Sequence, residues 1–301
     1  MKKIILGTLS ALFLLSGCDK ENEINQMVSE VSVEPQITST LLTDYEIPPN
    51  DIYYLQKLGF SGSTAKVLEK YDSSSGDTYI VYLLEGDIEF RADKLTQHLP
   101  FQALTKEGGL TSQYRTSVIA SPNTYTVAIS TYPLLYGTMN MGIQNAIQNY
   151  NNLNLGINFV LTSATTAGAR KNCNNDPNCI FVGNSSSVEG GQAGFPYNNG
   201  KPYKHIQLNT YLGDDYGVDV VEHVMTHELG HCIGLRHTDW YDRQCTLTPG
   251  NEGQTQYGAI HIPGTPTTFN QDFNSIMMAC FSANETGEFT NYDITALQEL
   301  W

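Results

Sequence analysis

Basic residues are scarce in this sequence. Lysine and arginine number 16 in a chain of 301 residues, against 31 aspartates and glutamates, so the formal net charge is −15. A chain this acidic repels nucleic acid and anionic lipid headgroups, which excludes nucleic-acid binding. Charged residues of both signs make up only 16% of the chain, a composition common in exported proteins. The apolar 40% is enough to form a core.

The apolar run near the N-terminus is too short to form a stable transmembrane helix. It covers residues 4–15 and follows Lys2 and Lys3, an order typical of a secretory signal. We therefore expect residues 1–17 to be removed as a signal peptide.

The signal ends in Leu15-Ser16-Gly17-Cys18, which resembles the lipobox of bacterial lipoproteins. This resemblance implies that Cys18 is lipidated and anchors the chain in a membrane, since each buried CH₂ group contributes about 0.8 kcal/mol. An ordinary signal peptide beside a stray cysteine is the alternative. Acidic residues 19–23 are similar to export tags of surface lipoproteins. We therefore expect an outer-membrane lipoprotein of the bacterial cell envelope, with exposure at the cell surface.

Cysteines are few, and their number is odd once the lipidated one is set aside. Five of the six then remain, and an oxidising compartment permits disulfides between them. Cys173 and Cys179 flank an Asn-Asn-Asp-Pro-Asn turn, which predicts a small local bridge. Cys245 with Cys280 is the second expected pair. The thiol left over is then Cys232, which we expect to be buried.

The N-terminal third of the chain divides into a tether and a small unit. Residues 18–50 are polar and poor in aromatic residues, which is typical of a tether. Residues 51–112 form the small unit. Its pattern predicts a helix over Asp51–Leu58, a second short helix over Ala65–Tyr71 and a strand over Thr78–Leu84, followed by a linker.

Residues 113–301 are enough for one compact domain and contain no internal repeat. Apolar residues spaced for a helix and alternating residues spaced for strands predict most of its elements. Thr290, with Asp293 three residues later, predicts the start of a final helix. The expected order is a strand at 125–129, a helix at 139–150, strands at 157–161, 180–182 and 205–209, a helix at 218–235 and a last helix from 294.

Three of the seven histidines fall in eleven residues of the 218–235 helix and its continuation. His227 and His231 are four apart, so they lie on one face of a helix. A catalytic zinc site takes three protein ligands and leaves one position open. Gly234 can adopt the positive φ that ends a helix, which would return His237 to the same point. Glu228 follows the first histidine and can reach that point without being a ligand.

The stretch HELGHCIGLRH matches the HExxHxxGxxH pattern of the metzincin metallopeptidases and most resembles the dual-action HEIGH metallopeptidases, although Leu229 replaces their isoleucine. The resemblance implies one catalytic Zn²⁺ held by three histidines, with Glu228 as general base. The zinc ligands would be His227, His231 and His237. His223, one turn earlier, is an alternative ligand, but a core or supporting position is favoured. Histidines merely packed in a core helix are the structural alternative.

Ser275-Ile276-Met277 resembles the methionine turn that lies beneath the zinc in metzincins, which assigns Met277 to that turn. Met278 is the neighbouring alternative. Ala279 stands where astacin-like members have a tyrosine that approaches the metal, so no tyrosine ligand is assigned. Thr238 also departs from the residue that follows the third histidine in the best-known metzincins. Both departures indicate a separate branch.

Glu85-Gly86-Asp87-Ile88 is similar to the Gly-Asp segment that keeps astacin-type zymogens latent. The resemblance implies that Asp87 is a latency switch, that residues 51–112 are a pro-region, and that an activating cut falls between about 98 and 115. An ordinary turn after a strand is the alternative. No cysteine lies in this region, so a thiol switch is excluded.

For two further groups of residues we expect no role in the metal site. Some metzincins bind structural calcium, and acidic residues near Asp176 and Asp272 could do so, but solvated loops are favoured. His98, His205 and His261 are expected at the surface or in loops.

The resemblance implies an α+β fold: a metzincin-like zincin catalytic domain over 113–301, with a twisted, mostly parallel sheet, an active-site helix and an irregular C-terminal half. We expect an antiparallel edge strand within Gly191–Tyr197, against which an extended protein or peptide substrate would bind. The expected function is a secreted, lipid-anchored zinc endopeptidase made as a zymogen. The alternative is a zinc-bearing surface lipoprotein that binds protein without cleaving it.

Overall fold

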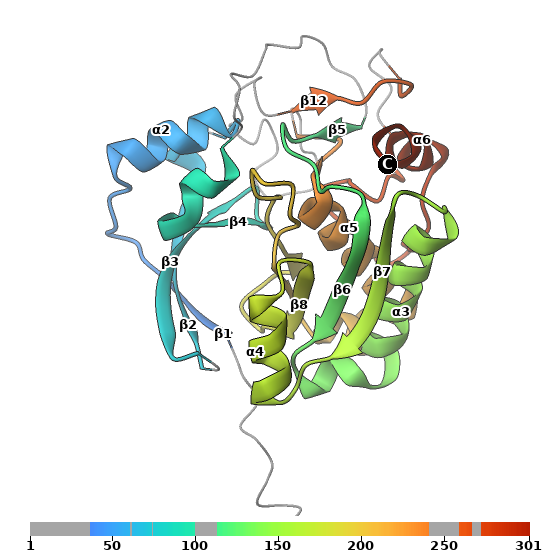
Figure 1. Cartoon of the computed structure of the whole chain (residues 1–301), viewed down its shortest axis with the longest axis horizontal. Helices are drawn as coiled ribbons and strands as arrows, with labels where there is room; N and C mark the ends of the chain where they lie inside the picture. Colours follow the sequence, from blue (N-terminus) through green and yellow to red (C-terminus); the bar gives the residue numbers. More distant parts are fainter. Residues whose placement is uncertain (1–36, 61, 74, 100–112, 241–258, 267–271) are drawn as a thin grey trace, which may run out of the picture. The chain divides into compact units, whose positions relative to one another are not determined.

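The computed structural model describes residues 37–60, 62–73, 75–99, 113–240, 259–266 and 272–301 (Figure 1). The expected signal peptide, Cys18, most of the expected tether, the linker expected to carry the activating cut, and Cys245 lie outside these ranges. The described residues all belong to one compact unit of the chain. None of the described helices is long and apolar enough to cross a membrane.

The central element is a five-stranded sheet in the order β7-β6-β8-β10-β9. Its first four strands run parallel, while β9 pairs antiparallel with β10 at the edge. The expected mostly parallel sheet with an antiparallel edge strand is therefore confirmed. The strands are β6 (Asn123–Ile129), β7 (Ile157–Ser163), β8 (Cys179–Asn184), β9 (Gly191–Gln192) and β10 (His205–Leu208).

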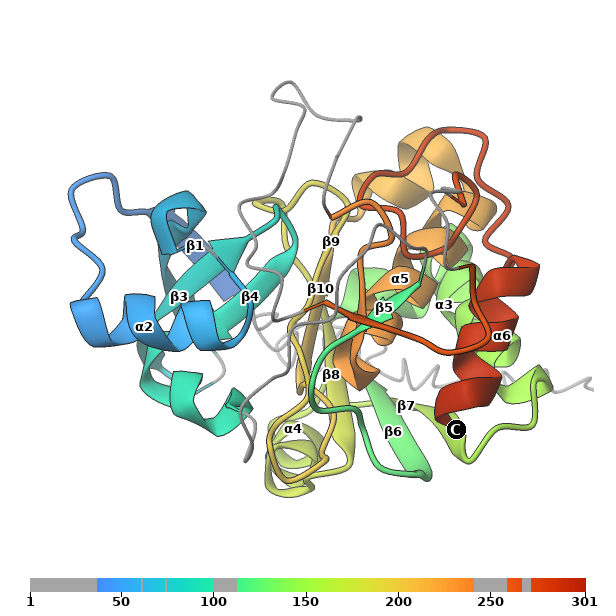
Figure 2. The ribbon, with the colours of Figure 1, turned by 90° about the horizontal axis from the view of Figure 1, so that it is seen from above.

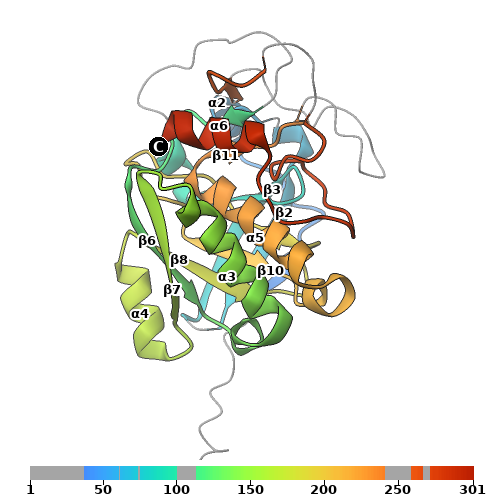
Figure 3. The same cartoon turned by 90° about the vertical axis from the view of Figure 1, so that its right-hand side faces the viewer.

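Two long helices pack side by side against one face of this sheet (Figure 3). They are α3 (Gly137–Asn152) and α5 (Val218–Ile233), both close to the expected ranges. Their backbones approach closely, because a Cβ atom at Gly142 would lie only 2.6 Å from Val221. The helix that carries the histidine motif is thus packed against α3 on one side and against the sheet on its inner face.

A shorter helix, α4 (Ala167–Asn175), lies against the opposite face. Its Cys173 packs with Ala128 and Phe181, whose sequence neighbours on β6 and β8 point into the main core instead. Successive side chains of a strand point to opposite faces of its sheet, so both faces of these strands are covered.

Helix α5 ends as its glycine predicts. Gly234 adopts φ +116°, and its N–H donates to the carbonyl of Gly230 at 3.0 Å. The chain then forms β11 (Leu235–Arg236), which joins β5 (Tyr114–Arg115) and β12 (Ile260–His261) in a small antiparallel sheet.

The described residues after β12 are irregular up to α6 (Asn291–Leu300). Thr290 caps this helix and exchanges hydrogen bonds with Asp293 in a capping box, which confirms the predicted start. Shorter helical turns elsewhere are η3 (Tyr132–Leu135) and a π-helical turn, η4 (Leu212–Tyr216).

Residues 37–99 form the N-terminal unit, which has its own antiparallel sheet in the order β1-β2-β3-β4. Its first strand falls within residues 18–50, so the folded part begins before the boundary expected at residue 51. Its elements are β1 (Ile37–Leu41), α2 (Pro49–Lys57), η1 (Gly62–Thr64), β2 (Lys66–Asp72), β3 (Asp77–Leu84), β4 (Ile88–Arg91) and η2 (Ala92–His98).

The second short helix expected over Ala65–Tyr71 is wrong, because this segment is β2. It pairs along its whole length with β3, from Lys66 opposite Leu83 to Asp72 opposite Asp77. Leucine, glutamate and lysine favour a helix locally, but the hairpin pairing outweighs that preference.

The N-terminal unit joins the edge of the five-stranded sheet (Figure 2). Ile88 forms a parallel bridge with Ala193, next to β9. The N–H of Glu89 donates to the carbonyl of Ala193 at 2.7 Å, and the N–H of Ala193 donates to the carbonyl of Asp87 at 2.9 Å. Buried Lys70 reinforces the junction by bonding Glu89 and, at 2.6 Å, Gln192.

Candidate metal centre

The three histidines of the motif converge on one point. Helix α5 supplies His227 and His231, and the turn at Gly234 followed by β11 brings back His237. Nε2 of His237 lies 3.2 Å from Nε2 of His231 and 3.3 Å from Nε2 of His227. All three rings are buried. Three imidazole nitrogens at one point form a donor set that suits zinc.

Two of the rings are oriented by a carbonyl acceptor at Nδ1, and the third has a carboxylate close to Nδ1. Nδ1 of His227 donates to the carbonyl of Ile276 at 2.7 Å, and Nδ1 of His231 donates to the carbonyl of Leu235 at 3.0 Å. Nδ1 of His237 lies 3.2 Å from the carboxylate of Glu85. When the proton of each ring is on Nδ1, the Nε2 lone pairs face one another, and this is the form of the site that binds a cation.

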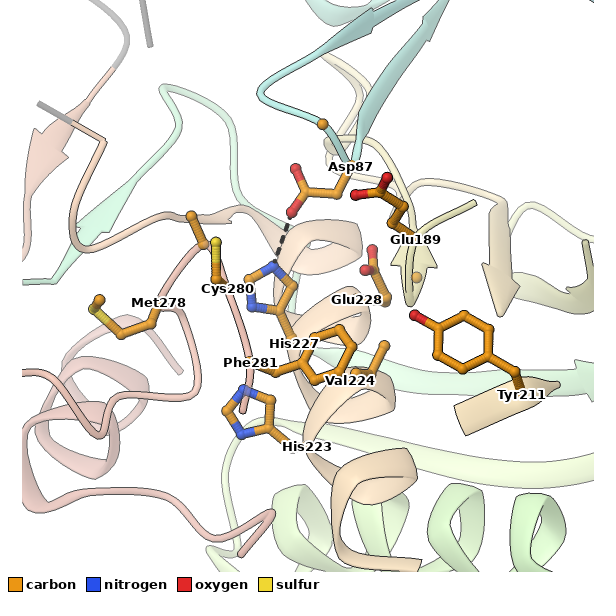
Figure 4. Close-up of a pocket in the computed structure, with 13 residues that line it drawn as sticks. Asp87, Glu189, Tyr211, His223, Val224, His227, Glu228, Met278, Cys280 and Phe281 are labelled. Atoms are coloured by element: carbon orange, nitrogen blue, oxygen red, sulfur yellow. Dashed lines mark ion pairs between the residues drawn. The ribbon is translucent and has the colours of Figure 1, made fainter. Parts of the chain in front are cut away.

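Asp87 completes the cluster from the tip of the β3–β4 hairpin. Its Oδ2 lies 3.4 Å from Nε2 of His227 (Figure 4). The same oxygen lies 3.0 Å from Nε2 of His237 and 3.9 Å from Nε2 of His231. Possible ligand atoms of these four residues all lie within 4.8 Å of one another, as a single cation would require. The donor set therefore fits a metal ion held by three nitrogens and one oxygen.

The hairpin tip that carries Asp87 has an unusual backbone. Leu84 and Ile88 pair across the hairpin, which leaves Glu85, Gly86 and Asp87 as a three-residue loop. Glu85 adopts φ +58° and Gly86 φ +102°. The left-handed region costs a non-glycine residue about 1 kcal/mol. This geometry turns both carboxylates of the tip towards the histidines, so the strain coincides with the site.

The pKa values of Asp87 and His231 leave a negatively charged carboxylate and a neutral imidazole in the cluster, as a cation requires. Burial alone would raise the pKa of Asp87, but the charge of His237 and the hydrogen bonds with His227 and His237 hold it well below its usual value. Burial, followed by the charges of His227 and His237, lowers the pKa of His231 well below its usual value. Asp87 is therefore a carboxylate, and the His231 imidazole is neutral.

Glu228 lies beside the cluster and is not part of it. It is 2% exposed, and its Oε2 has no hydrogen-bond partner among the described residues. Burial, and then the charge of Asp87, raises the pKa of this carboxyl well above its usual value. The side chain lines a cavity of about 270 Å³ that also reaches Asp87 and His227 (Figure 4). The most basic carboxylate of the site thus faces a space beside the metal ligands.

Met277 lies beneath the motif helix. A Cβ atom at Gly230 would be only 2.6 Å from its sulfur, so the methionine packs directly on the helix at the residue before His231. The carbonyl of Met277 accepts the N–H of Thr238 at 2.9 Å. Met278, the alternative, lines the cavity instead.

Asp293 ties this turn to the last helix. Its carboxylate accepts the hydroxyl of Ser275 at 2.6 Å, the N–H of Ile276 at 3.0 Å and the side-chain amide of Gln113 at 2.9 Å. Ile276 is the residue whose carbonyl orients His227. The capping box of α6 therefore supports His227 through one intervening residue.

The remaining predicted residues are not members of the cluster, although Cys280 lines the cavity beside it. Cys173 and Cys179 form a disulfide, and Cys232 is free and buried. Cys280 is disulfide-bonded, but Cys245 lies outside the described residues, so this pairing stays a prediction. The carboxylate of Asp176 accepts the N–H of Asn178, and that of Asp272 accepts the hydroxyl of Thr290. The only cluster of at least three possible metal ligands among the described residues is the histidine site.

The expected surface or loop position is wrong for His98, and His205 is not in a loop either, because it begins β10 and its ring stacks on Phe181 at 5.7 Å. His98 is not at the surface but is 2% exposed, at the end of η2. Its ring stacks on Tyr197 at 4.6 Å and meets Phe90 edge-on at 5.0 Å. A lone histidine in a polar stretch gives no sign of this burial, which depends on the N-terminal unit packing against the residues after β9.

Sequence reasoning missed two residues of the site, Glu85 and Gly191. Glu85 stands two residues before Asp87, and only the left-handed backbone of the hairpin tip brings it to His237 and Arg236. Gly191 lies at the edge strand, where a Cβ atom would be 2.3 Å from Oε1 of Glu228. No local pattern signals either contact.

Comparison with known families bears on the same residues. The model of the family described as dual-action HEIGH metallo-peptidase matches residues 83–301, a range that includes the hairpin tip, the three histidines and Met277. No curated protein matches the chain. Because the family match covers most of the chain and the donor set fits a metal ion, the chain belongs to the dual-action HEIGH metallopeptidases.

Proposed function

We propose that this protein is a zinc endopeptidase, anchored by lipid on Cys18 and made as a zymogen that Asp87 keeps latent. The observation that carries the proposal is the convergence of His227, His231, His237 and Asp87, with Glu228 held beside them and not among them. A protein that only binds zinc has no use for a basic carboxylate at this position.

The chain's own residues have distinct parts in peptide hydrolysis. His227, His231 and His237 would hold the zinc ion. Zinc supplies Lewis acidity, which polarises the scissile carbonyl and makes a nearby water more acidic. Glu228 takes the proton of the attacking water and delivers it to the leaving amine, so a C–O bond forms as the C–N bond breaks. Burial raises the pKa of the Glu228 carboxyl, so its carboxylate is a stronger base than that of an exposed glutamate.

Latency is supported by two contacts of the N-terminal unit. Asp87 lies on the histidines, where it would take the ligand position that catalysis needs open. The backbone of Asp87 and Glu89 also bonds Ala193, at the edge where an extended substrate would add a strand. Removal of this unit would free both the ligand position and the edge.

Anchorage rests on the sequence alone. Lipidation of Cys18 would place the enzyme on the outer membrane, exposed to protein substrates outside the cell. A Cys18→Ser chain should then leave the membrane fraction and appear in the soluble fraction. Retention of this variant in the membrane would contradict the proposed anchor.

The proposed enzyme can be tested on purified residues 19–301. Zinc content and casein cleavage are measured before and after limited proteolysis, with Glu228→Ala as the matched control. We expect about one zinc ion per chain, with chelator-sensitive cleavage that rises when the N-terminal unit is lost and never appears in the control. Bound zinc without cleavage in any form would favour the non-catalytic alternative.

A further inference from the structure

The cavity beside the metal centre extends along helix α5 to a second buried histidine. His223 lies four residues before His227 and lines the same cavity (Figure 4). Its side chain is 4% exposed, and its Nε2 is buried without a hydrogen-bond partner among the described residues. Buried polar atoms without a partner are rare in folded proteins, so this nitrogen calls for one.

The carboxylate of Glu285 determines whether Nε2 of His223 acts as a hydrogen-bond donor or as an acceptor. Nδ1 of His223 lies 3.6 Å from Oε2 of Glu285, so the favoured tautomer carries its proton on Nδ1. Burial, and then the charge of His227, lowers the pKa of His223 to about 3, which keeps the ring neutral near pH 7. Nε2 therefore presents a lone pair and accepts hydrogen bonds.

The other groups that line the cavity also favour a ligand that donates hydrogen bonds and carries a positive charge. Glu189 contributes a carboxylate, and the hydroxyl of Tyr211 points towards the cavity (Figure 4). The ring of Phe281 supplies an aromatic wall and meets Tyr216 edge-on. Within the described part of the chain, no lysine or arginine lines the cavity. Hydrogen-bond acceptors, an aromatic face and acidic surroundings are the features that bind a guanidinium group.

We propose that this cavity, which we call the His223 pocket, binds the side chain of an arginine, or less tightly a lysine, of the substrate, next to the bond that is cleaved. Nε2 of His223 accepts a hydrogen bond from the guanidinium, Glu189 balances its charge, and Phe281 stacks on its plane. Glu285 acts as a positioning residue by holding the tautomer of His223. The proposal rests on the proposed function in that a peptide is the ligand.

An aliphatic side chain would fit the pocket less well. It would displace water from Nε2 and leave the nitrogen without a partner, a loss that disfavours such a ligand by roughly tenfold. An acidic side chain would meet the like charge of Glu189.

Binding tests the pocket without requiring catalysis. The probes are the N-acetyl methylamides of arginine, citrulline, leucine and glutamate, titrated into the zinc-loaded full chain and followed by NMR. Citrulline is the matched control because it has the shape of arginine but no charge. We expect the arginine probe to bind at least about tenfold more tightly than each of the other three.

Two variants assign the preference to His223. His223→Leu removes the acceptor and should reduce the preference for arginine over citrulline and leucine about tenfold, whereas His223→Gln keeps an amide oxygen that can accept and should retain part of it. Glu285→Gln should weaken arginine binding without abolishing it. Equal affinities for the arginine, citrulline and leucine probes, or a preference that persists in His223→Leu, would overturn the proposal.

Cleavage then separates this proposal from the proposed function. Peptides that vary only at the residue after the scissile bond are offered to the chain activated by limited proteolysis. We expect kcat/KM for arginine to exceed that for leucine at least about tenfold, and His223→Leu to remove the difference. Failure to cleave any peptide would count against the peptidase while the binding result still decides the pocket. Cleavage that prefers leucine would count against the pocket alone.

Discussion

Gly191 leaves room for the carboxylate of Glu228. A Cβ atom at position 191 would lie 2.3 Å from Oε1 and 2.8 Å from Cδ of Glu228, closer than real contacts allow. The edge strand and the motif helix thus approach each other at the point where the proposed general base stands, and the absence of a side chain permits it.

Gly191→Ala should therefore impair catalysis more than folding. The added methyl group pushes Glu228 away from the cavity, and a misplaced general base lowers kcat about 100-fold. Zinc content should not change, because the three heavy atoms nearest to a Cβ atom at Gly191 all belong to Glu228. Gly168→Ala is the matched control, since a Cβ atom there meets nothing within 4 Å. Equal activity of the two variants would show that Glu228 is not displaced.

Glu228→Gln keeps the size of the side chain and removes its basicity. We expect kcat of the activated enzyme to fall about 10³-fold, in the range that general bases contribute, while zinc content and melting temperature stay close to those of the parent chain. Assays should compare casein cleavage with zinc analysis on the same preparation. A variant with full activity and bound zinc would refute the assigned role.

Asp87→Ala should release the latent enzyme. The fourth ligand is lost while the backbone contacts of the hairpin tip remain, so we expect partial activity in the unprocessed chain. Asp93→Ala is the control, because Asp93 lies in the same unit and its exposed carboxylate bonds Arg91, away from the histidines. Activity is measured with a short fluorogenic peptide before any proteolysis. If Asp87→Ala stays as inactive as the control, the edge-strand contact alone is sufficient for latency.

Glu85→Gln should weaken zinc binding in the unprocessed chain. Glu85 orients His237 through its Nδ1, and loss of such a supporting carboxylate lowers metal affinity roughly 10- to 100-fold. The processed enzyme has lost this residue, so its affinity should not depend on the substitution. Competition with a chromogenic chelator measures both forms. Equal affinities of the parent and variant in the unprocessed chain would show that Glu85 does not support the metal site.

Acid should weaken the packing of the N-terminal unit. Burial lowers the pKa of His98 to about 4, against about 6.5 when it is free. Between these values the unfolded chain binds a proton that the folded chain does not, so stability rises with pH in this window. His98 contributes at most about 1.4 kcal/mol per pH unit to the slope of the free energy of unfolding against pH. His98→Phe keeps an aromatic ring and should reduce the slope by about one proton, measured by urea unfolding at several pH values. An unchanged slope would show that His98 does not titrate in this window.

The motif helix and its end follow from local rules. Histidines four apart share one face of any helix, and Gly234 is the residue type that adopts the left-handed conformation observed there. The ranges of the central strands, the final helix and its capping box also follow from local patterns, whereas the parallel arrangement of the strands was implied by the family resemblance. By contrast, the helix predicted over Ala65–Tyr71 is the strand β2. Its pairing depends on β3, a partner that local residue preference does not reveal.

The sequence alone determined the family, the three histidines and the glutamate between them, because their chemistry is encoded in spacings of a few residues along one helix. Only the tertiary structure decided which acceptor orients each histidine and which residues meet Glu228 and His223. Asp87 and His237 are 150 residues apart, and Gly191 and Glu228 come from different elements. Contacts of this kind depend on how whole elements pack, and packing is a property of the assembled core, which no short stretch of sequence contains.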